Sequence, residues 1–146
     1  MKSKLLLDGA EKVFAVVFDA GDEVMAGLEQ FATEQGLDSA QIAAIGAFSR
    51  ATFGFYDRER KEYDTIPVAE QVEVLSLIGD ISLNEGKPQI HVHGVVGLRD
   101  GTTRGGHLLN AHVWPTLEVI ITESPGHLRR RMSEEAGLPL IALDVA

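Results

Sequence analysis

The sequence contains no cysteine among its 146 residues. This absence excludes disulfide bonds, cysteine-ligated zinc, iron–sulfur clusters and a thiol nucleophile, so any metal ligand has to be a histidine or a carboxylate. Basic residues are also few, because 13 Lys and Arg stand against 22 Asp and Glu, which gives a formal charge of −9. That charge disfavours nucleic-acid binding driven by counterion release from phosphates.

Long hydrophobic runs are missing as well. No stretch approaches the roughly 20 apolar residues that cross a bilayer, and the three leucines after residues 1–4 are too few for a signal peptide. We therefore expect a cytoplasmic protein without a membrane partner. Hydrophobic residues make up 45% of the chain, which has no linker or low-complexity tract, so we expect one compact domain over residues 1–146.

Most of the chain has the alternating or β-branched pattern of strands, bounded by Gly, Asp and Pro. Strands are predicted at residues 4–7, 13–18, 42–49, 51–56, 63–68, 71–83, 90–98, 108–122 and 138–145. One clear helix is predicted from a cap at Asp22 to a stop at Gly36, with one face covering a sheet. A shorter helix is predicted at 127–136, with its three arginines on a solvated face. Pro115 implies an edge strand or a bulge.

The most specific local feature is His91-Val92-His93 in a predicted strand. Residues i and i+2 of a strand project from the same face, with Cα atoms about 6.6 Å apart. Two imidazoles at this spacing can converge on one cation at about 2.0–2.1 Å each. The alternative is a pair of neutral histidines at half-buried sheet positions.

A third imidazole is available on the next predicted strand. His107 follows Gly105-Gly106, and a hairpin would bring it beside the His91 strand. Three histidines with an open fourth position are typical of a catalytic or exchangeable zinc site. Alternatively, the glycines merely allow a tight turn and His107 is exposed. His112 is a weaker candidate, because its odd separation from His107 places it on the opposite face of a shared strand.

Three other side chains are candidates to orient a ligating histidine or to transfer a proton. Glu73 shares a strand face with Leu75 and Leu77, where a carboxylate needs a partner unless the edge is exposed. Asn110 and Glu118 qualify by residue type alone, and on the wet face of a strand such residues commonly have no special role. Phosphate-binding glycine loops and the serine-hydrolase elbow are absent from the sequence.

The order of several short motifs resembles the plant and prokaryote conserved (PPC) domain over about residues 5–123. The motifs are Gly46-Ala47-Phe48, Val72-Glu73-Val74-Leu75-Ser76-Leu77 with Gly79, Lys87-Pro88, His91-Val92-His93, Asp100-Gly101, Gly105-Gly106-His107-Leu108 and Val113-Trp114-Pro115-Thr116-Leu117-Glu118. The resemblance implies an α/β (α+β) fold, mainly an antiparallel sheet with one helix packed on it, assembled as a homotrimer. It also implies zinc bound by His91, His93 and His107.

Two features of plant members of this family are missing here. The AT-hook sequence Arg-Gly-Arg-Pro is represented only by Arg104-Gly105-Gly106, and the Gly-Arg pair of the partner motif Gly-Arg-Phe-Glu-Ile-Leu is replaced by Glu70-Gln71. With the negative charge, these departures make direct DNA binding unexpected. The sequence favours a homotrimeric, metal-binding domain with a small-molecule or enzymatic role. The alternative is a non-enzymatic regulatory module that contacts DNA, transcription proteins or other protein partners.

Overall fold

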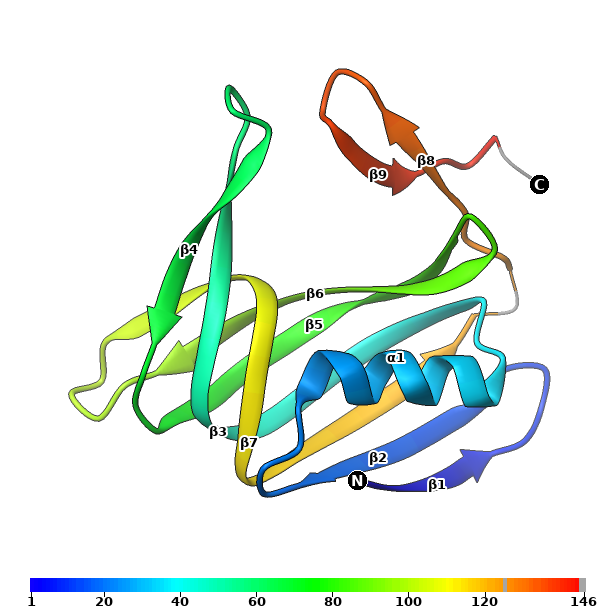
Figure 1. Ribbon diagram of the computed structural model, residues 1–146. Helices are drawn as coiled ribbons and strands as arrows, with labels where there is room; N and C mark the ends of the chain where they lie inside the picture. The colour runs from blue at the N-terminus through cyan, green and yellow to red at the C-terminus, as the bar shows by residue number, and fades with distance from the viewer. Residues whose placement is uncertain (125, 145–146) are drawn as a thin grey trace.

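The computed structural model describes residues 1–124 and 126–144. Within these residues the chain forms one helix and nine strands, and all strand pairs are antiparallel (Figure 1). The elements are β1 (Lys2–Leu7), β2 (Val13–Asp19), α1 (Val24–Gln35), β3 (Ser39–Asp57), β4 (Glu62–Val68), β5 (Val72–Asn84), β6 (Lys87–Gly97), β7 (Thr103–Glu123), β8 (Arg130–Ser133) and β9 (Leu138–Ile141). The expected antiparallel sheet with one principal helix is confirmed.

Seven strands form one sheet in the order β1-β2-β7-β6-β5-β3-β4, and β7 also pairs with β3. The pairings of β3, β5, β6 and β7 therefore form a closed ring. This closure is available because β3 and β7 are long, at 19 and 21 residues, and curve strongly (Figure 1). Their apolar side chains fill the core, where Phe48, Phe53 and Leu108 are completely buried.

Helix α1 lies across one face of the sheet (Figure 1). Val24, Leu28, Phe31 and Ala32 recur at helical spacing and are buried. The helix begins one residue later than predicted, because the carboxylate of Glu23 accepts the hydrogen bond from Ala26 N at 2.6 Å. It ends at Gly36, as predicted, in the left-handed conformation that glycine adopts without strain. No helix of the described residues is long and apolar enough to span a membrane.

The predicted helix at residues 127–136 is wrong. The chain there forms β8 and the turn to β9, and the last strand ends at Ile141 rather than continuing to Val145, which lies outside the described residues. Gly137, at φ 70°, closes this hairpin, and Leu83 N donates to Leu128 O at 2.9 Å to join it to the end of β5. These long-range contacts override the weak local helical pattern.

Two further predictions are refined by the sheet. The strands expected at 42–49 and 51–56 are one continuous strand, β3. Pro115 lies where the β3–β7 register shifts between Gly46–Leu117 and Phe48–Val113. The bulge alternative is therefore correct, and β7 is an interior strand rather than an edge strand.

Candidate metal centre

The two histidines of β6 share one face of the strand, as predicted. Ile90, Val92 and Val96 are buried on the other face, and the period-2 alternation leaves His91 and His93 opposite the core. Nε2 of His91 lies 3.2 Å from Nε2 of His93. The strand pattern alone therefore places two imidazole nitrogens next to each other.

The β6–β7 hairpin brings the third histidine to this pair. His107 is the direct cross-strand partner of His93. The register is fixed by the intervening turn, in which Leu98 N donates to Thr102 O at 2.8 Å and the Asp100 carboxylate accepts from Thr102 N at 2.9 Å. Gly105 permits the close approach of the two strands, because a Cβ at this position would lie 2.3 Å from Gly94 O.

The three imidazoles form a compact cluster. One nitrogen from each of His91, His93 and His107 lies within 4.8 Å of the others, and the ring centroids are 5.1–5.3 Å apart. His93 is exposed, whereas His91 and His107 are partly buried. The alternative in which His107 is a solvent-exposed turn residue is therefore wrong.

The environment disfavours protonation of His93 and His107. Burial, followed by the charges of His91, His93 and Arg130, lowers the pKa of His107 from 6.5 to about 4. Burial and the neighbouring His91 also lower the pKa of His93. Nδ1 of His107 is buried and has no hydrogen-bond partner among the described residues. Neutral imidazoles with unshared nitrogen lone pairs are the form that binds a metal, so the cluster fits a cation.

A carboxylate on the adjacent strand contacts the outer nitrogen of one histidine. Asp80 is the cross-strand partner of His91 on β5, and its Oδ2 lies 3.5 Å from His91 Nδ1. Burial alone would raise the pKa of Asp80, but the interactions with His91, Arg130 and Ser82 together lower it below its usual value. Asp80 is therefore ionised beside His91, as carboxylates that orient metal-ligating histidines are.

Two hairpins flank the cluster on opposite sides. On the β3–β4 hairpin, Tyr63 stacks on the His107 ring with centroids 4.7 Å apart. On the β8–β9 hairpin, Arg130 reaches Asp80. The hairpins also contact each other, because Lys61 Nζ donates to Glu134 O at 2.5 Å and Tyr56 Oη donates to Ala136 O.

The sequence patterns did not identify Asp80, Arg130 and Tyr63 as part of the site. The position of Asp80 follows from the β5–β6 turn: with a two-residue turn at Glu85-Gly86, Asn84 pairs with Lys87, and counting back along both strands pairs Asp80 with His91. No local signal identified Arg130, which the sequence placed on a solvated helix face. The structure corrects that expectation, because the Arg130 side chain is only 5% exposed whereas that of Arg131 is 57% exposed.

The structure places the three other candidate residues elsewhere in the sheet. Glu73 is exposed beside Gly97, because a register shift after Val74 breaks the alternation that predicted an apolar environment. Asn110 is exposed opposite Thr52. Glu118 is exposed between β2 and β3. Among the described residues, no hydrogen bond or ion pair joins any of them to the three histidines.

The cluster lies at the border of an exposed apolar face. Cross-strand partners share a face, and the row Ala15, Ile120, Ala43, Ile78, His93 crosses five strands as successive partners. Ile78 is 58% exposed and Ile120 is 44% exposed. A shallow cavity of about 510 Å³ is lined mainly by apolar side chains of this face.

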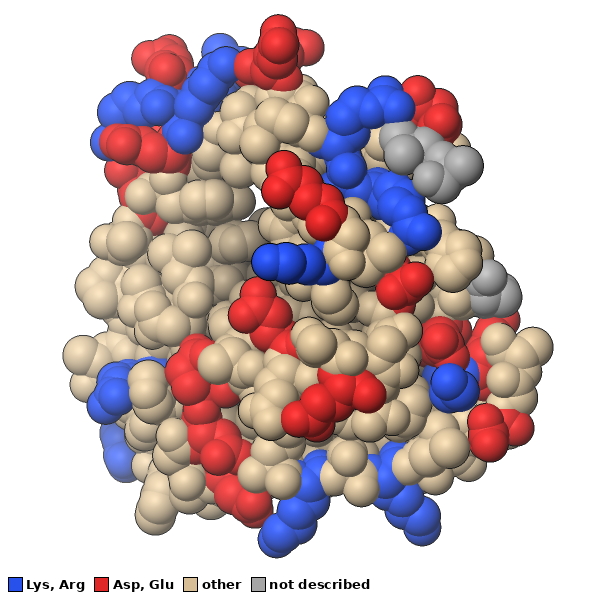
Figure 2. All heavy atoms as spheres, turned by 45° about the vertical axis from the view of Figure 1, so that its right-hand side comes forward, with Lys and Arg blue, Asp and Glu red and all other residues tan. Residues whose placement is uncertain are grey.

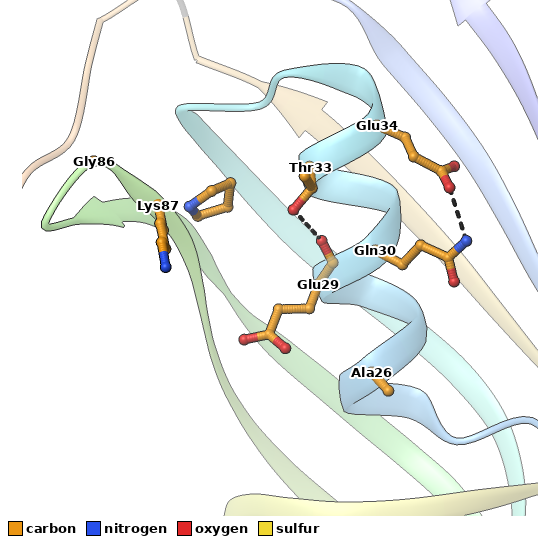
Figure 3. A pocket seen from close by; sticks show the side chains of 8 residues that line it. Ala26, Glu29, Gln30, Thr33, Glu34, Gly86 and Lys87 are labelled. Carbon is orange, nitrogen blue, oxygen red and sulfur yellow. Dashed lines mark hydrogen bonds between the residues drawn. The ribbon is translucent and has the colours of Figure 1, made fainter.

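A larger cavity, of about 820 Å³, lies between α1 and the β5–β6 turn rather than at the histidines (Figure 3). Two of its lining side chains donate hydrogen bonds along the helix. Gln30 Nε2 donates to Glu34 at 2.7 Å, and Thr33 Oγ1 donates to Glu29 O at 2.8 Å (Figure 3). Among the described residues, the group of three possible metal ligands is formed by the histidines and not by this lining, so the histidine cluster is the better candidate site.

Comparison with known proteins identifies the family of the chain. The sequence profile of the Plants and Prokaryotes Conserved (PCC) domain matches residues 8–125. The chain belongs to this family. No curated protein sequence matches this member of the family.

Solved structures show the same fold along nearly the whole chain. A metal-containing protein from Archaeoglobus fulgidus is 35% identical, with a TM-score of 0.83 and coverage of 97% of this chain and 99% of that chain. A proposed DNA-binding protein from Ralstonia eutropha is 37% identical, with a TM-score of 0.83 and coverage of 89% and 90%. A plant- and prokaryote-conserved protein from Pyrococcus horikoshii is 28% identical, with a TM-score of 0.83 and coverage of 91% and 93%.

Proposed function

We propose that this PCC-domain protein binds one divalent metal ion, with zinc preferred, through His91, His93 and His107. The observation that carries the proposal is the convergence of three imidazole nitrogens within 4.8 Å. Neutral imidazole is a common zinc ligand, and three protein ligands leave a fourth position for an exchangeable group. The description of the Archaeoglobus relative as metal-containing supports the proposal.

The chemistry of the site favours a small-molecule or enzymatic role. A zinc ion with an open coordination position supplies Lewis-acid chemistry to a bound ligand. The chain's own residues would then hold the ligating nitrogens unprotonated, with Asp80 against His91 and burial keeping His107 neutral. The exposed side of His93 leaves the cluster accessible from solvent.

Metal content per chain tests this proposal. Tag-free protein is loaded with zinc, freed of excess ion and measured by elemental mass spectrometry beside His91→Ala, His93→Ala and His107→Ala. We expect near-stoichiometric zinc in the wild type and its loss in each variant. His127→Ala is the matched control, because the His127 side chain is 67% exposed and its Nδ1 lies 3.6 Å from Asp38 Oδ2, away from the three histidines. Equal loss in the control, or no zinc in the wild type, contradicts the proposal.

We also propose that the protein assembles as a homotrimer through the exposed apolar face. Val17, Ile45, Ile78 and Ile120 are 37–60% exposed there, and contiguous exposed apolar surface of this kind is typical of subunit interfaces. Because His93 borders this face, a neighbouring copy would lie close to the metal centre. Light scattering should give a mass of three times 15.8 kDa, or about 47 kDa.

The second candidate function is a regulatory module that contacts DNA. It is favoured by the description of the Ralstonia relative as a proposed DNA-binding protein. The charge of −9 opposes it, and on the face shown in Figure 2 the basic side chains are interspersed with acidic ones. A DNA affinity that falls steeply with salt, and persists in His91→Ala, would favour this function over the metal-dependent one.

A further inference from the structure

The C-terminal hairpin lies outside the residues matched by the family, yet it reaches the histidine cluster. The match ends at residue 125, and β8 and β9 begin after it. The hairpin stands beside the β5–β6 turn (Figure 1) and is joined to it by the Leu83 N to Leu128 O hydrogen bond of 2.9 Å. Its first strand residue, Arg130, points back to the sheet.

Arg130 is the most enclosed charged side chain near the histidines, at 5% exposure. Its Nε donates to Ser82 Oγ at 2.6 Å, Nη2 to Asp80 Oδ1 at 2.7 Å and Nη1 to Pro139 O at 3.0 Å. A planar guanidinium with three directed partners has one orientation. The hairpin therefore presents Nη2 of a fixed guanidinium to the Asp80 carboxylate.

The two oxygens of Asp80 have different partners. Oδ1 accepts from Arg130 at 2.7 Å and from Ser82 Oγ at 3.0 Å. Oδ2 lies 3.5 Å from His91 Nδ1. Because Arg130 Nη2 and the Ser82 hydroxyl both donate to Oδ1, the carboxylate cannot rotate without losing these hydrogen bonds, and Oδ2 remains directed at the histidine.

We propose that Arg130 is a positioning residue for the metal centre, which holds Asp80 so that Oδ2 accepts the proton of His91 Nδ1 and leaves Nε2 free for the metal. This inference rests on the proposed metal-binding function. A neutral imidazole carries one proton, and the hydrogen bond at one nitrogen decides which nitrogen has the free lone pair. With the proton on Nε2 instead, His91 would donate to His93 Nε2, 3.2 Å away. Neither the Nε2 of His91 nor the Nε2 of His93 would then be available to a metal.

Arg130 itself also lies close to the same imidazole nitrogen. Nη2 is 3.3 Å from His91 Nδ1, compared with 2.7 Å from Asp80 Oδ1. A guanidinium can only donate, so this hydrogen bond competes with the Asp80 carboxylate for His91 Nδ1 and by itself favours the tautomer with the proton on Nε2. The carboxylate therefore has two roles, because it retains the guanidinium and accepts from the imidazole.

This arrangement makes a distinctive prediction for Asp80→Asn. The amide oxygen has to face Arg130 and Ser82, both of which donate to this position. The amide NH₂ then faces His91 Nδ1 and donates to it, which moves the imidazole proton to Nε2. Zinc affinity should fall by about 10–100-fold, the usual effect of losing the partner that orients a ligating histidine.

Removing Arg130 should have opposite effects in the two backgrounds. In the wild type, Arg130→Met frees the Asp80 carboxylate to rotate and should weaken zinc binding by about 10-fold. In the Asp80→Asn background, Arg130→Met frees the amide to turn its oxygen toward His91 and should recover part of the lost affinity. Arg131→Met is the matched control, because Arg131 lies on the same hairpin with a 57% exposed side chain, and it should change the affinity less than about twofold.

Two measurements test the proposal. The His91 tautomer is read from ¹⁵N chemical shifts of the ring in chelator-treated protein, without any metal, and zinc affinity is measured by competition with a chromophoric chelator. We expect Nδ1–H in the wild type and Nε2–H in Asp80→Asn. Amide resonances of β8 and β9 show whether the hairpin keeps its place in Arg130→Met.

The outcomes separate this inference from the proposed function. If the wild type binds zinc and His91→Ala does not, but Asp80→Asn keeps the wild-type tautomer and affinity, the positioning role is refuted and the metal centre stands. A weaker double variant than Asp80→Asn alone also refutes it. If the hairpin detaches in Arg130→Met, the tautomer and zinc affinity of Asp80→Asn alone decide whether the positioning role holds. If the wild type binds no zinc, both the proposed function and this inference fail.

Discussion

Lowering the pH should destabilise the metal-free protein, and His107 should make a large contribution to this effect. Burial and the nearby charges lower its pKa from 6.5 to about 4 in the folded protein. The unfolded chain takes up the proton near pH 6.5, whereas the folded protein takes it up only near pH 4. The unfolded state therefore binds more protons between these values, and the free energy of unfolding decreases as the pH falls through this window.

The magnitude follows from the size of the shift. A separation of about 2.5 pKa units corresponds to at most about 3.4 kcal/mol, and about 2 kcal/mol of this is lost by about pH 5. His107 is only partly buried, so solvent screening reduces the expected loss to about 1–2 kcal/mol. Above about pH 7 the contribution to stability is fully present.

Urea unfolding followed by circular dichroism, with a chelator present, measures this effect. The wild type, His107→Gln and His127→Gln are compared at about pH 7.5 and about pH 5. The wild type and the His127 control should lose about 1–2 kcal/mol more than His107→Gln over this range, because His107→Gln removes the imidazole whose pKa is lowered to about 4, while His93 is present in all three proteins. Parallel losses in all three proteins would refute the reasoning.

Three further predictions concern the site and the assembly. Zinc at 100 times its dissociation constant should raise the free energy of unfolding by about 2.7 kcal/mol in the wild type and leave His93→Ala unchanged in a thermal shift experiment. Gly105→Ala should destabilise the protein by about 1–3 kcal/mol and weaken zinc binding, since the added Cβ would lie 2.3 Å from Gly94 O. The control Gly9→Ala should not weaken zinc binding, because the atom nearest to its added Cβ is 3.8 Å away. Ile45→Asp should dissociate the proposed trimer in light scattering, whereas the control Met132→Asp on β8 should leave the mass unchanged. An unchanged mass in Ile45→Asp would place the interface elsewhere.

Local patterns were reliable where one strand or one helix settled the outcome. His91 and His93 share a face because alternation is a property of a single strand, and α1 follows from the spacing of its buried residues. Alternation failed at Glu73, because a register shift relative to β6 reverses the faces in the middle of β5. The helix predicted at 127–136 failed because its short pattern was weaker than the pairing of β8 with β9.

The sequence by itself determined helix α1, the paired histidines and the turn that returns His107 to them. These features depend on residues close together in the chain, where backbone periodicity and turn chemistry act directly. The tertiary structure alone decided that β3 and β7 close the ring and that Arg130 meets Asp80, 50 residues away. Such contacts depend on how distant segments pack, and an arginine that is solvated in one packing is enclosed in another.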